Sequence, residues 1–247
     1  MAVDVKPYYD SYWSDSGFNP AGGDLTSPLR VLMEAHIQPG DRCLDVGCGD
    51  GQTAGPWLIE RGCEYLGVDV AETAVRQARA HGLEARLLED ASVLPVEDGS
   101  FDVALSIEVF EHLFAPHLVA AEIHRVLRPG GLLLVTVPNV AYWRRRLDLA
   151  LPGRWNPVGD DLSVEQPWRD PHIRFFNPRS LRHMLRSVGY ETVHVEGHVG
   201  ALTRDLPIAR RLWSGRPSLL YRVAERRLPA LLGLRVCAVA FKAREAA

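Results

Sequence analysis

Short runs of apolar and β-branched residues alternate with segments of helical spacing along this chain. The runs are about four to nine residues long, which favours buried strands over helices. The predicted strands are Arg42–Val46, Glu64–Asp69, Ala85–Leu88, Phe101–Ser106, Leu132–Val137, Glu191–Val195 and Leu234–Lys242. The predicted helices are Leu29–His36, Gln52–Arg61, Glu72–His81, Pro116–Arg128 and Pro178–Val188. Strands that alternate with helices are typical of βαβ units, so the pattern predicts an α/β fold with a mostly parallel, doubly wound sheet.

Two long segments interrupt this alternation in the C-terminal half. Residues 139–171 are rich in proline and glycine, and residues 197–233 contain helical stretches between the last two predicted strands. Long insertions in a compact domain usually form lids or substrate walls. We therefore expect residues 1–247 to form a single domain whose helical insertions lie on the substrate side.

The composition narrows the class of protein. Hydrophobic residues make up 47% of the 247 positions and charged residues 24%, as in a globular domain and unlike a disordered or coiled-coil chain. The net charge of −3 does not indicate a nucleic-acid partner. The four cysteines lack disulfide-scaffold or zinc-ligand spacing, and the N-terminus lacks an apolar signal segment, so we expect a cytoplasmic location.

Three loops that follow predicted strands carry carboxylates. The first contains Asp45 before a G-x-G-x-G turn, the second ends at Asp69, and the third contains Asp90. In a parallel sheet these loops share one edge, where ligands bind. Asp45 suits an ammonium group, Asp69 suits ribose hydroxyls and Asp90 suits an adenine amino group. S-adenosylmethionine has all three groups, whereas the glycine spacing and Asp45 disfavour the pyrophosphate of NAD. The alternative for the first loop is a tight turn without a ligand.

Several stretches of the sequence resemble the motifs of class I methyltransferases. In this chain, the stretch LDVGCGDG resembles the first motif of that family and GVDVAETAV the second. The stretch LLEDASVLPVEDGSFDVALSIEVFEHL resembles the third and fourth. The stretch LRPGGLLLVTVPN resembles the strand that follows, so the match covers Arg42 to Asn139. The resemblance implies a seven-stranded Rossmann-like sheet whose final strand is antiparallel and pairs with Glu191–Val195.

The same resemblance assigns cofactor-binding roles. It implies that the glycines line the methionine part of S-adenosylmethionine, that Asp69 binds ribose, and that Asp90 and the Ala91 amide bind adenine. The predicted cofactor-binding residues are Tyr12, Asp45, Gly47, Gly49, Gly51, Asp69, Val70, Asp90, Ala91 and Ile107. An aromatic cluster in residues 1–26, namely Tyr8, Tyr9, Tyr12 and Trp13, is expected to close over the cofactor as a lid. The alternative is that these rings only pack on the sheet.

The loop after the fourth strand contains a candidate metal site. Glu108, Glu111 and His112 form an E-x-x-E-H pattern, in which one turn of helix can gather two carboxylates and an imidazole. Such a set suits Mg²⁺ or another divalent cation. The pattern resembles the metal-binding element of ubiquinone-biosynthesis and small-RNA 2′-O-methyltransferases, which implies His172 as a fourth ligand. Without a metal, His112 and His172 are the candidate catalytic bases, whereas His117 and His124 are expected to be surface or core residues.

The insertions suggest an acceptor. Arginines are frequent in both, and the second mixes them with apolar residues between Arg204 and Arg227. This segment could hold an anionic or lipid-linked substrate or rest on a membrane, or it could be a solvated helix face. The leading hypothesis is O-methylation of a hydroxylated small molecule, with a carbohydrate considered first and a polyketide or quinone-like phenol second. The alternatives are N- or C-methylation without metal, and a cofactor-binding regulatory protein without turnover. The sequence does not define an oligomeric state.

Overall fold

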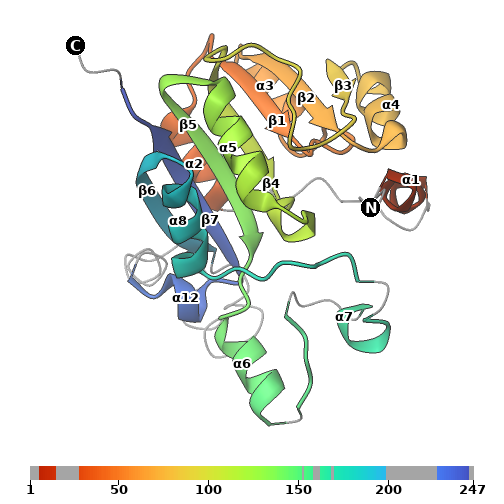
Figure 1. Cartoon of the computed structure of the whole chain (residues 1–247), viewed down its shortest axis with the longest axis vertical. Helices are drawn as coiled ribbons and strands as arrows, with labels where there is room; N and C mark the ends of the chain where they lie inside the picture. Colours follow the sequence, from red (N-terminus) through yellow and green to blue (C-terminus); the bar gives the residue numbers. More distant parts are fainter. Residues whose placement is uncertain are drawn as a thin grey trace.

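A seven-stranded sheet forms the centre of the molecule (Figure 1). The structure is a computed structural model, and it describes residues 6–14, 28–151, 153–157, 162–167, 170–198 and 227–244. The strands are β1 (Arg42–Val46), β2 (Glu64–Asp69), β3 (Ala85–Leu87), β4 (Phe101–Ile107), β5 (Leu127–Pro138), β6 (Tyr190–His198) and β7 (Arg235–Lys242). Their order is β3-β2-β1-β4-β5-β7-β6. The strands from β1 to β5 pair in parallel, and β7 pairs antiparallel with β5 and β6. The predicted doubly wound sheet and its antiparallel last strand are confirmed.

Helices cover both faces of the sheet. The helices are α1 (Lys6–Ser14), α2 (Pro28–His36), α3 (Gly55–Glu60), α4 (Glu72–Ala80), the 3-10 turn η1 (Phe110–His112), α5 (Pro116–Val126), α6 (Trp143–Ala150), α7 (Leu162–Glu165), α8 (Pro178–Ser187) and α12 (Pro229–Leu232). Apolar side chains of α5 and α8 join one buried cluster, and those of α2 and α3 join another on the opposite face. In Figure 1 the sheet accordingly separates α2 and α3 from α5 and α8. Among the described helices, none combines the length and the apolar character that a membrane span requires.

Two predicted boundaries were wrong for tertiary reasons. Helix α5 ends at Val126 instead of Arg128, and β5 begins at Leu127 instead of Leu132. Leu127 is fully buried, which anchors the extended backbone there. The Nζ of Lys242, from the far end of the chain, donates hydrogen bonds to the carbonyls of His124 and Leu127 at 2.8 and 2.7 Å. This lysine satisfies carbonyls that a longer helix would have bonded internally.

Other boundaries moved less. Helix α3 begins at Gly55, because the glycine turn before it extends further than predicted, and β6 continues to His198, within the segment assigned to the second insertion. The described part of residues 139–171 contains α6 and α7. Most of the second insertion, including Arg204, lies outside the described residues, so its predicted role stays a prediction.

The chain reverses its direction across the sheet between β1 and β4. These strands are neighbours, but β1 leads to β2 on one side and β4 leads to β5 on the other. Loops at such a switch point diverge above the carboxyl ends of the strands and leave room for a ligand. The loops after β1 and β4 are those that carry the predicted glycine turn and the predicted metal ligands.

Asn139 fastens the end of β5 to the last helix. Its side chain is 1% exposed, and Nδ2 lies within hydrogen-bond distance of the carbonyls of Pro229, Ala230 and Gly233, at 3.2, 3.1 and 2.6 Å. The Oδ1 atom accepts from the amide of Ala141 at 3.0 Å. One buried amide thus joins β5, the start of the first insertion and α12.

We predict that Asn139→Ala lowers the free energy of unfolding by about 2 to 3 kcal/mol, because it leaves buried carbonyls without a donor. Asn177→Ala, which removes the N-cap of α8, serves as a matched reference with an expected cost of about 1 kcal/mol. Urea unfolding measures both. Equal losses in the two variants would contradict the role assigned to Asn139.

Candidate active site

The glycine turn after β1 is packed closely by side chains of two other segments. Gly47 and Gly49 have φ values of +76° and +57°, which glycine adopts at little cost. A Cβ at Gly47 would lie 2.5 Å from Cγ2 of Val109, and one at Gly49 would lie 2.4 Å from Cζ2 of Trp13. Glycine is therefore required at both positions, because the loop after β4 packs on one and helix α1 covers the other.

Two buried carboxylates lie at the ends of β1 and β2. Asp45 is 2% exposed, and its Oδ2 accepts a hydrogen bond from the hydroxyl of Tyr65 at 3.2 Å. Asp69 accepts from the amides of Gly49 and Ala71, both at 2.9 Å. Burial raises the pKa of Asp45 to about 7, and burial also raises the pKa of Asp69. Two buried carboxylates at one edge favour a ligand with positive charge.

Asp90 lies in the loop after β3 and is exposed. Its Oδ1 accepts from the amide and hydroxyl of Ser92 at 2.8 and 2.7 Å, which lowers its pKa. A carboxylate has about four acceptor positions, so Asp90 retains capacity for a further donor. The remaining predicted cofactor residues Val70, Ala91 and Ile107 are half-buried and pack against the core beside these loops.

Helix α1 contacts the glycine turn after β1, the N-terminus of α4 and the turn after β4. The carboxylate of Asp10 accepts from the amide of Thr73 at 3.0 Å, and so caps the N-terminus of α4 from another helix. The ring of Trp13 covers Gly49, and the hydroxyl of Tyr9 lies 3.4 Å from the carbonyl of His112. Tyr12 is half-buried between neighbouring rings. These contacts bring the aromatic segment to the predicted cofactor site, while its closure as a lid stays a prediction.

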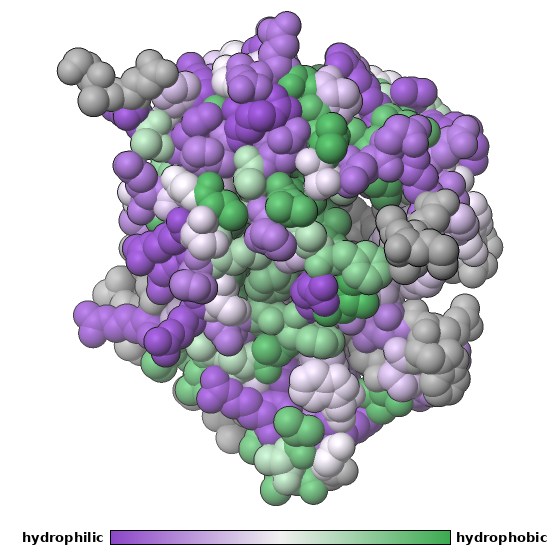
Figure 2. Space-filling model, in the orientation of Figure 1, coloured by the Kyte–Doolittle hydropathy of each residue, from purple (hydrophilic) through white to green (hydrophobic). Residues whose placement is uncertain are grey.

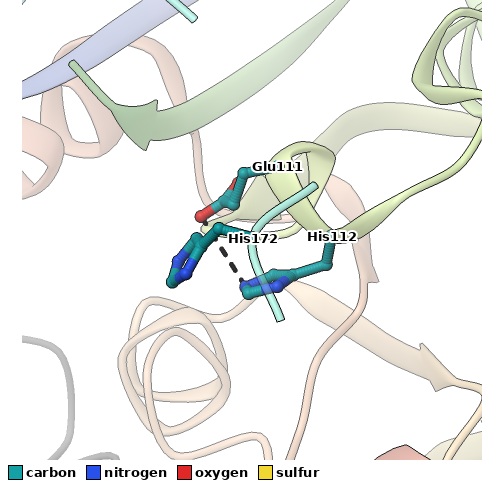
Figure 3. Close-up of side chains that lie close together, drawn as sticks. All are labelled: Glu111, His112 and His172. Atoms are coloured by element: carbon teal, nitrogen blue, oxygen red, sulfur yellow. Dashed lines mark ion pairs between the residues drawn. The ribbon is translucent and has the colours of Figure 1, made fainter. Parts of the chain in front are cut away.

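The loop after β4 and the segment before α8 bring three of the four predicted metal ligands together. One donor atom each from Glu111, His112 and His172 lies within 4.8 Å of the others, and the three side chains converge in Figure 3. Glu111 is 1% exposed, and within the described part of the chain neither carboxylate oxygen has a hydrogen-bond partner. Its backbone carbonyl accepts from the amides of Ile173 and Arg174 at 2.9 and 3.0 Å, which fixes the neighbouring segment.

Both imidazoles are oriented by acceptor atoms at their Nδ1 positions. The Nδ1 of His112 lies 3.3 Å from the carbonyl of Pro171, and the Nδ1 of His172 lies 2.5 Å from Oδ1 of Asp170. A carbonyl and a carboxylate accept hydrogen bonds, so the proton of each neutral ring resides on Nδ1. The Nε2 lone pairs are then free to bind a cation, an arrangement that is usual for metal-binding histidines.

Burial shifts the pKa values of two members of this cluster, Glu111 and His112. Burial, and secondarily the charge of Glu108, raises the pKa of Glu111 well above its ordinary value. Burial and the neighbouring His172 lower the pKa of His112 to about 4. Neutral imidazoles are the form that binds metals, whereas Glu111 must lose its proton to do so.

The carboxylate of Glu108 has other partners than the predicted metal site. It accepts from the hydroxyl of Thr136 at 2.9 Å and pairs with Arg235 at 3.1 Å. Its φ of +56° is rare for a residue with a side chain. The predicted four-residue set is thus observed as three residues, with Glu108 facing the start of β7.

Sequence reasoning missed several of these partners. Asp170 precedes His172 by two residues, a spacing that could have indicated a carboxylate–histidine pair. Tyr65, Thr136 and Arg235 carry no local signal, because their contacts depend on strand pairing. The predicted assignments of His117 and His124 agree with an exposed and a half-buried position.

Hydrophobic side chains are exposed in segments that adjoin the cluster residues in the sequence. Phe114, Trp155 and Phe175 are 55%, 48% and 42% exposed, and the rings of Trp155 and Phe175 meet edge to face at 5.6 Å. Figure 2 shows green, hydrophobic residues gathering across the middle and lower part of this face, between the places of α5 and α6 in Figure 1. Phe114, Trp155 and Phe175 form an apolar wall, in which Phe114 and Phe175 follow His112 and His172 by two and three residues.

Comparisons with known proteins identify the family. A family model described as "Methyltransferase domain" matches residues 44–135, from β1 into β5. A ubiquinone biosynthesis O-methyltransferase of Idiomarina loihiensis is 30% identical over 200 residues, which cover 75% of this chain and 77% of the relative. A protein of the same name from Hahella chejuensis is 34% identical over 208 residues, covering 78% of this chain and 83% of the relative. The chain belongs to the class I S-adenosylmethionine-dependent methyltransferases.

The fold of this methyltransferase also agrees with solved structures. An S-adenosylmethionine-dependent methyltransferase of Thermotoga maritima is 19% identical, with a TM-score of 0.60 over 96% of this chain and 95% of that one. At this level of identity the likeness shows the fold alone. The predicted enzyme class and S-adenosylmethionine as its methyl donor are confirmed by the family.

The raised pKa of Asp45 predicts how the stability of the methyltransferase depends on pH. An unfolded aspartate has a pKa near 3.9, and the folded value is about 7. The folded state therefore binds more protons between these values, and its stability falls as pH rises from about 4 to about 7. We predict that Asp45→Asn removes this decline and is more stable than the wild type by about 2 to 4 kcal/mol at pH 8. Urea unfolding from pH 4 to pH 8 tests this, and parallel pH profiles would refute it.

Proposed function

We propose that this methyltransferase transfers a methyl group to a hydroxyl oxygen of a small molecule held at a divalent cation. The cation would be bound by Glu111, His112 and His172. The observation that carries this proposal is the buried Glu111 carboxylate, whose oxygens lack hydrogen-bond partners among the described residues and face two imidazoles with their Nδ1 atoms already engaged. The relatives named as O-methyltransferases support transfer to oxygen.

The cofactor residues act by binding and orientation. S-adenosylmethionine supplies the methyl group from a positively charged sulfonium. Asp69 would accept hydrogen bonds from the ribose hydroxyls, Asp90 and the Ala91 amide would bind adenine, and Asp45 would face the charged methionine part. Buried carboxylates fit this cationic group, and the turn of Gly47 and Gly49 would line it. Orientation of this kind provides most of the acceleration of a methyl transfer.

We predict that Asp69→Ala weakens the binding of S-adenosylmethionine by about 1 to 3 kcal/mol, because ribose hydrogen bonds are lost. The variant could also loosen the Gly49 turn, so binding of the 2′-deoxy analogue is compared by calorimetry. The wild type is expected to prefer the ribose form, and Asp69→Ala is expected to lose this preference. A preference that survives the substitution would remove Asp69 from the ribose site.

The donor atoms of the three-residue cluster fit a divalent cation. Metal–ligand distances of about 2.1 Å place neighbouring ligands roughly 3 to 4 Å apart, and the Nε2 of His112 lies 3.9 Å from Oε1 of Glu111. One carboxylate and two imidazoles suit Zn²⁺, Mn²⁺ or Fe²⁺ better than Mg²⁺, which prefers oxygen ligands. A divalent cation lowers the pKa of a hydroxyl that it binds. Asp170 and the Pro171 carbonyl keep the imidazoles aimed at one point.

The apolar wall bears on the choice of acceptor. Trp155 and Phe175 present exposed aromatic faces, and His172 belongs to the same segment as Phe175. Such rings stack well on a planar phenol and also on the apolar face of a sugar. We place a quinone-like phenol before a carbohydrate, since the relatives are named for ubiquinone biosynthesis.

We predict that Mn²⁺ or Zn²⁺ binds the purified protein with one equivalent, and that Glu111→Gln or His172→Ala weakens this binding on the order of a hundredfold. The His172→Ala variant should retain its affinity for S-adenosylmethionine and lose turnover. His117→Ala, which removes an exposed imidazole, is the matched control and should bind metal like the wild type. Calorimetry measures metal binding, and equal affinities in all four proteins would exclude the cluster.

A metal-independent mechanism is the second candidate. The contact of 2.5 Å between His172 and Asp170 favours it, because a carboxylate that holds Nδ1 of an imidazole orients Nε2 for proton transfer. In that case His172 would remove the proton of the acceptor hydroxyl directly. Methylation of a catechol in the presence of a strong chelator decides between the two: full activity supports the base, and complete loss that added metal restores supports the cation.

A further inference from the structure

The loop that carries Asp90 has no regular secondary structure between β3 and β4. It is anchored at both ends by buried leucines, Leu88 and Leu94, each 2% exposed. The amide of Leu88 donates to the backbone carbonyl of Asp69 at 2.7 Å, and the amide of Val93 donates to that of Asp90 at 3.1 Å. Asp90 therefore lies on a short arch, and its position depends on how firmly the arch is held after Leu94.

Two residues of α5 hold that part of the loop. Glu122 accepts from the amide of Leu94 at 2.9 Å. Arg125, one turn later on the same helix face, donates to the carbonyls of Leu94 and Val96 at 3.0 and 3.1 Å, and it pairs with Asp98. The two side chains are also joined to each other, through Nε to Oε2 at 2.9 Å and Nη2 to Oε1 at 2.7 Å.

Every N–H donor of the Arg125 guanidinium has an acceptor in this arrangement. One bond comes from Nε, two from Nη1 and two from Nη2, which accounts for its five donors. A lysine has three donors on one atom and cannot span two carbonyls and two carboxylates at once. This geometry therefore requires an arginine. If the residue only supplied a positive charge at the surface, a lysine would serve equally well.

The charges reinforce the arrangement. Hydrogen bonds from Arg125 lower the pKa of Glu122, and Glu122 and then Asp98 raise the pKa of Arg125. Exposed ion pairs contribute little to stability singly. Here the pair also satisfies two backbone carbonyls and one amide of the loop, so its main effect is on the position of the loop.

We propose that Glu122 and Arg125 are positioning residues for adenine recognition, which act by fixing the loop that carries Asp90 and Ala91. This inference rests on the proposed function, in which Asp90 accepts from the adenine amino group. Their side chains act through the loop, which they bond at Leu94, Val96 and Asp98. If the loop loosened, the Asp90 carboxylate would still be present but would no longer be held toward the adenine amino group. Selectivity for adenine would therefore fall more than affinity for the rest of the cofactor.

The test compares the binding of S-adenosylhomocysteine with that of S-inosylhomocysteine, which has an oxygen in place of the adenine amino group. Calorimetry gives both dissociation constants and hence the preference for adenine. We expect Arg125→Lys to reduce this preference on the order of tenfold while affinity for the inosine analogue changes less than about threefold. Glu122→Gln should reduce it in the same direction, and it leaves the arginine in place should the first variant fold poorly.

A control variant, Arg128→Lys, and the same test in an Asp90→Ala background distinguish the possible outcomes. Arg128→Lys alters a more exposed arginine, whose side chain pairs with Asp102 of β4, so the adenine preference should stay unchanged. Asp90→Ala should abolish the preference, and Arg125→Lys should then have no further effect. Equal weakening of both analogues by Arg125→Lys, or an intact preference, overturns the positioning role. An intact preference in Asp90→Ala instead overturns the proposed adenine site.

Discussion

Three carboxylates buried at one edge of the sheet are the constraint on which the rest of the site depends. Asp45, Asp69 and Glu111 are each less than a tenth exposed, and burial raises the pKa of all three. A buried carboxylate is costly unless a positive charge or hydrogen-bond donors compensate it. Asp69 is compensated in part by two backbone amides, whereas the oxygens of Glu111 have no hydrogen-bond partner in the described part of the chain. The fold thus retains groups that weaken it and that suit cationic ligands.

Strand order and helix packing place these carboxylates at one edge of the sheet. Apolar strands β1 and β4 are neighbours at the point where the chain reverses, so the glycine turn and the Glu111 turn meet at one edge. Helix α5 follows directly after the Glu111 turn, and its last turn holds the loop of Asp90 through Arg125. Helix α1 covers both turns through Trp13 and Tyr9. The proposed cofactor and acceptor residues are therefore supported by shared elements.

The sequence predicted the parts of the structure that local patterns determine. The strands Arg42–Val46 and Glu64–Asp69 were placed to the residue, because their apolar runs end at turn residues. The start of β5 was misplaced, since Lys242 and the burial of Leu127 override the Pro-Gly-Gly signal. In the site, Glu111 and His112 followed from spacing, and His172 followed from the family resemblance. The diversion of Glu108 to Arg235 did not, because β7 approaches from more than 120 positions further along the chain.

The central claim is that the buried carboxylates are neutralised by the ligand, and proton release on binding tests it most directly. Near pH 7 about half of the Asp45 carboxyls are protonated in the free protein, as follows from a pKa of about 7. Binding of a cationic cofactor should lower that pKa and expel the proton. Calorimetry at pH 7 in two buffers of different ionisation enthalpy counts the protons released when S-adenosylmethionine binds. The account predicts that the wild type releases about half a proton more than Asp45→Asn. Equal release by the two proteins would contradict it.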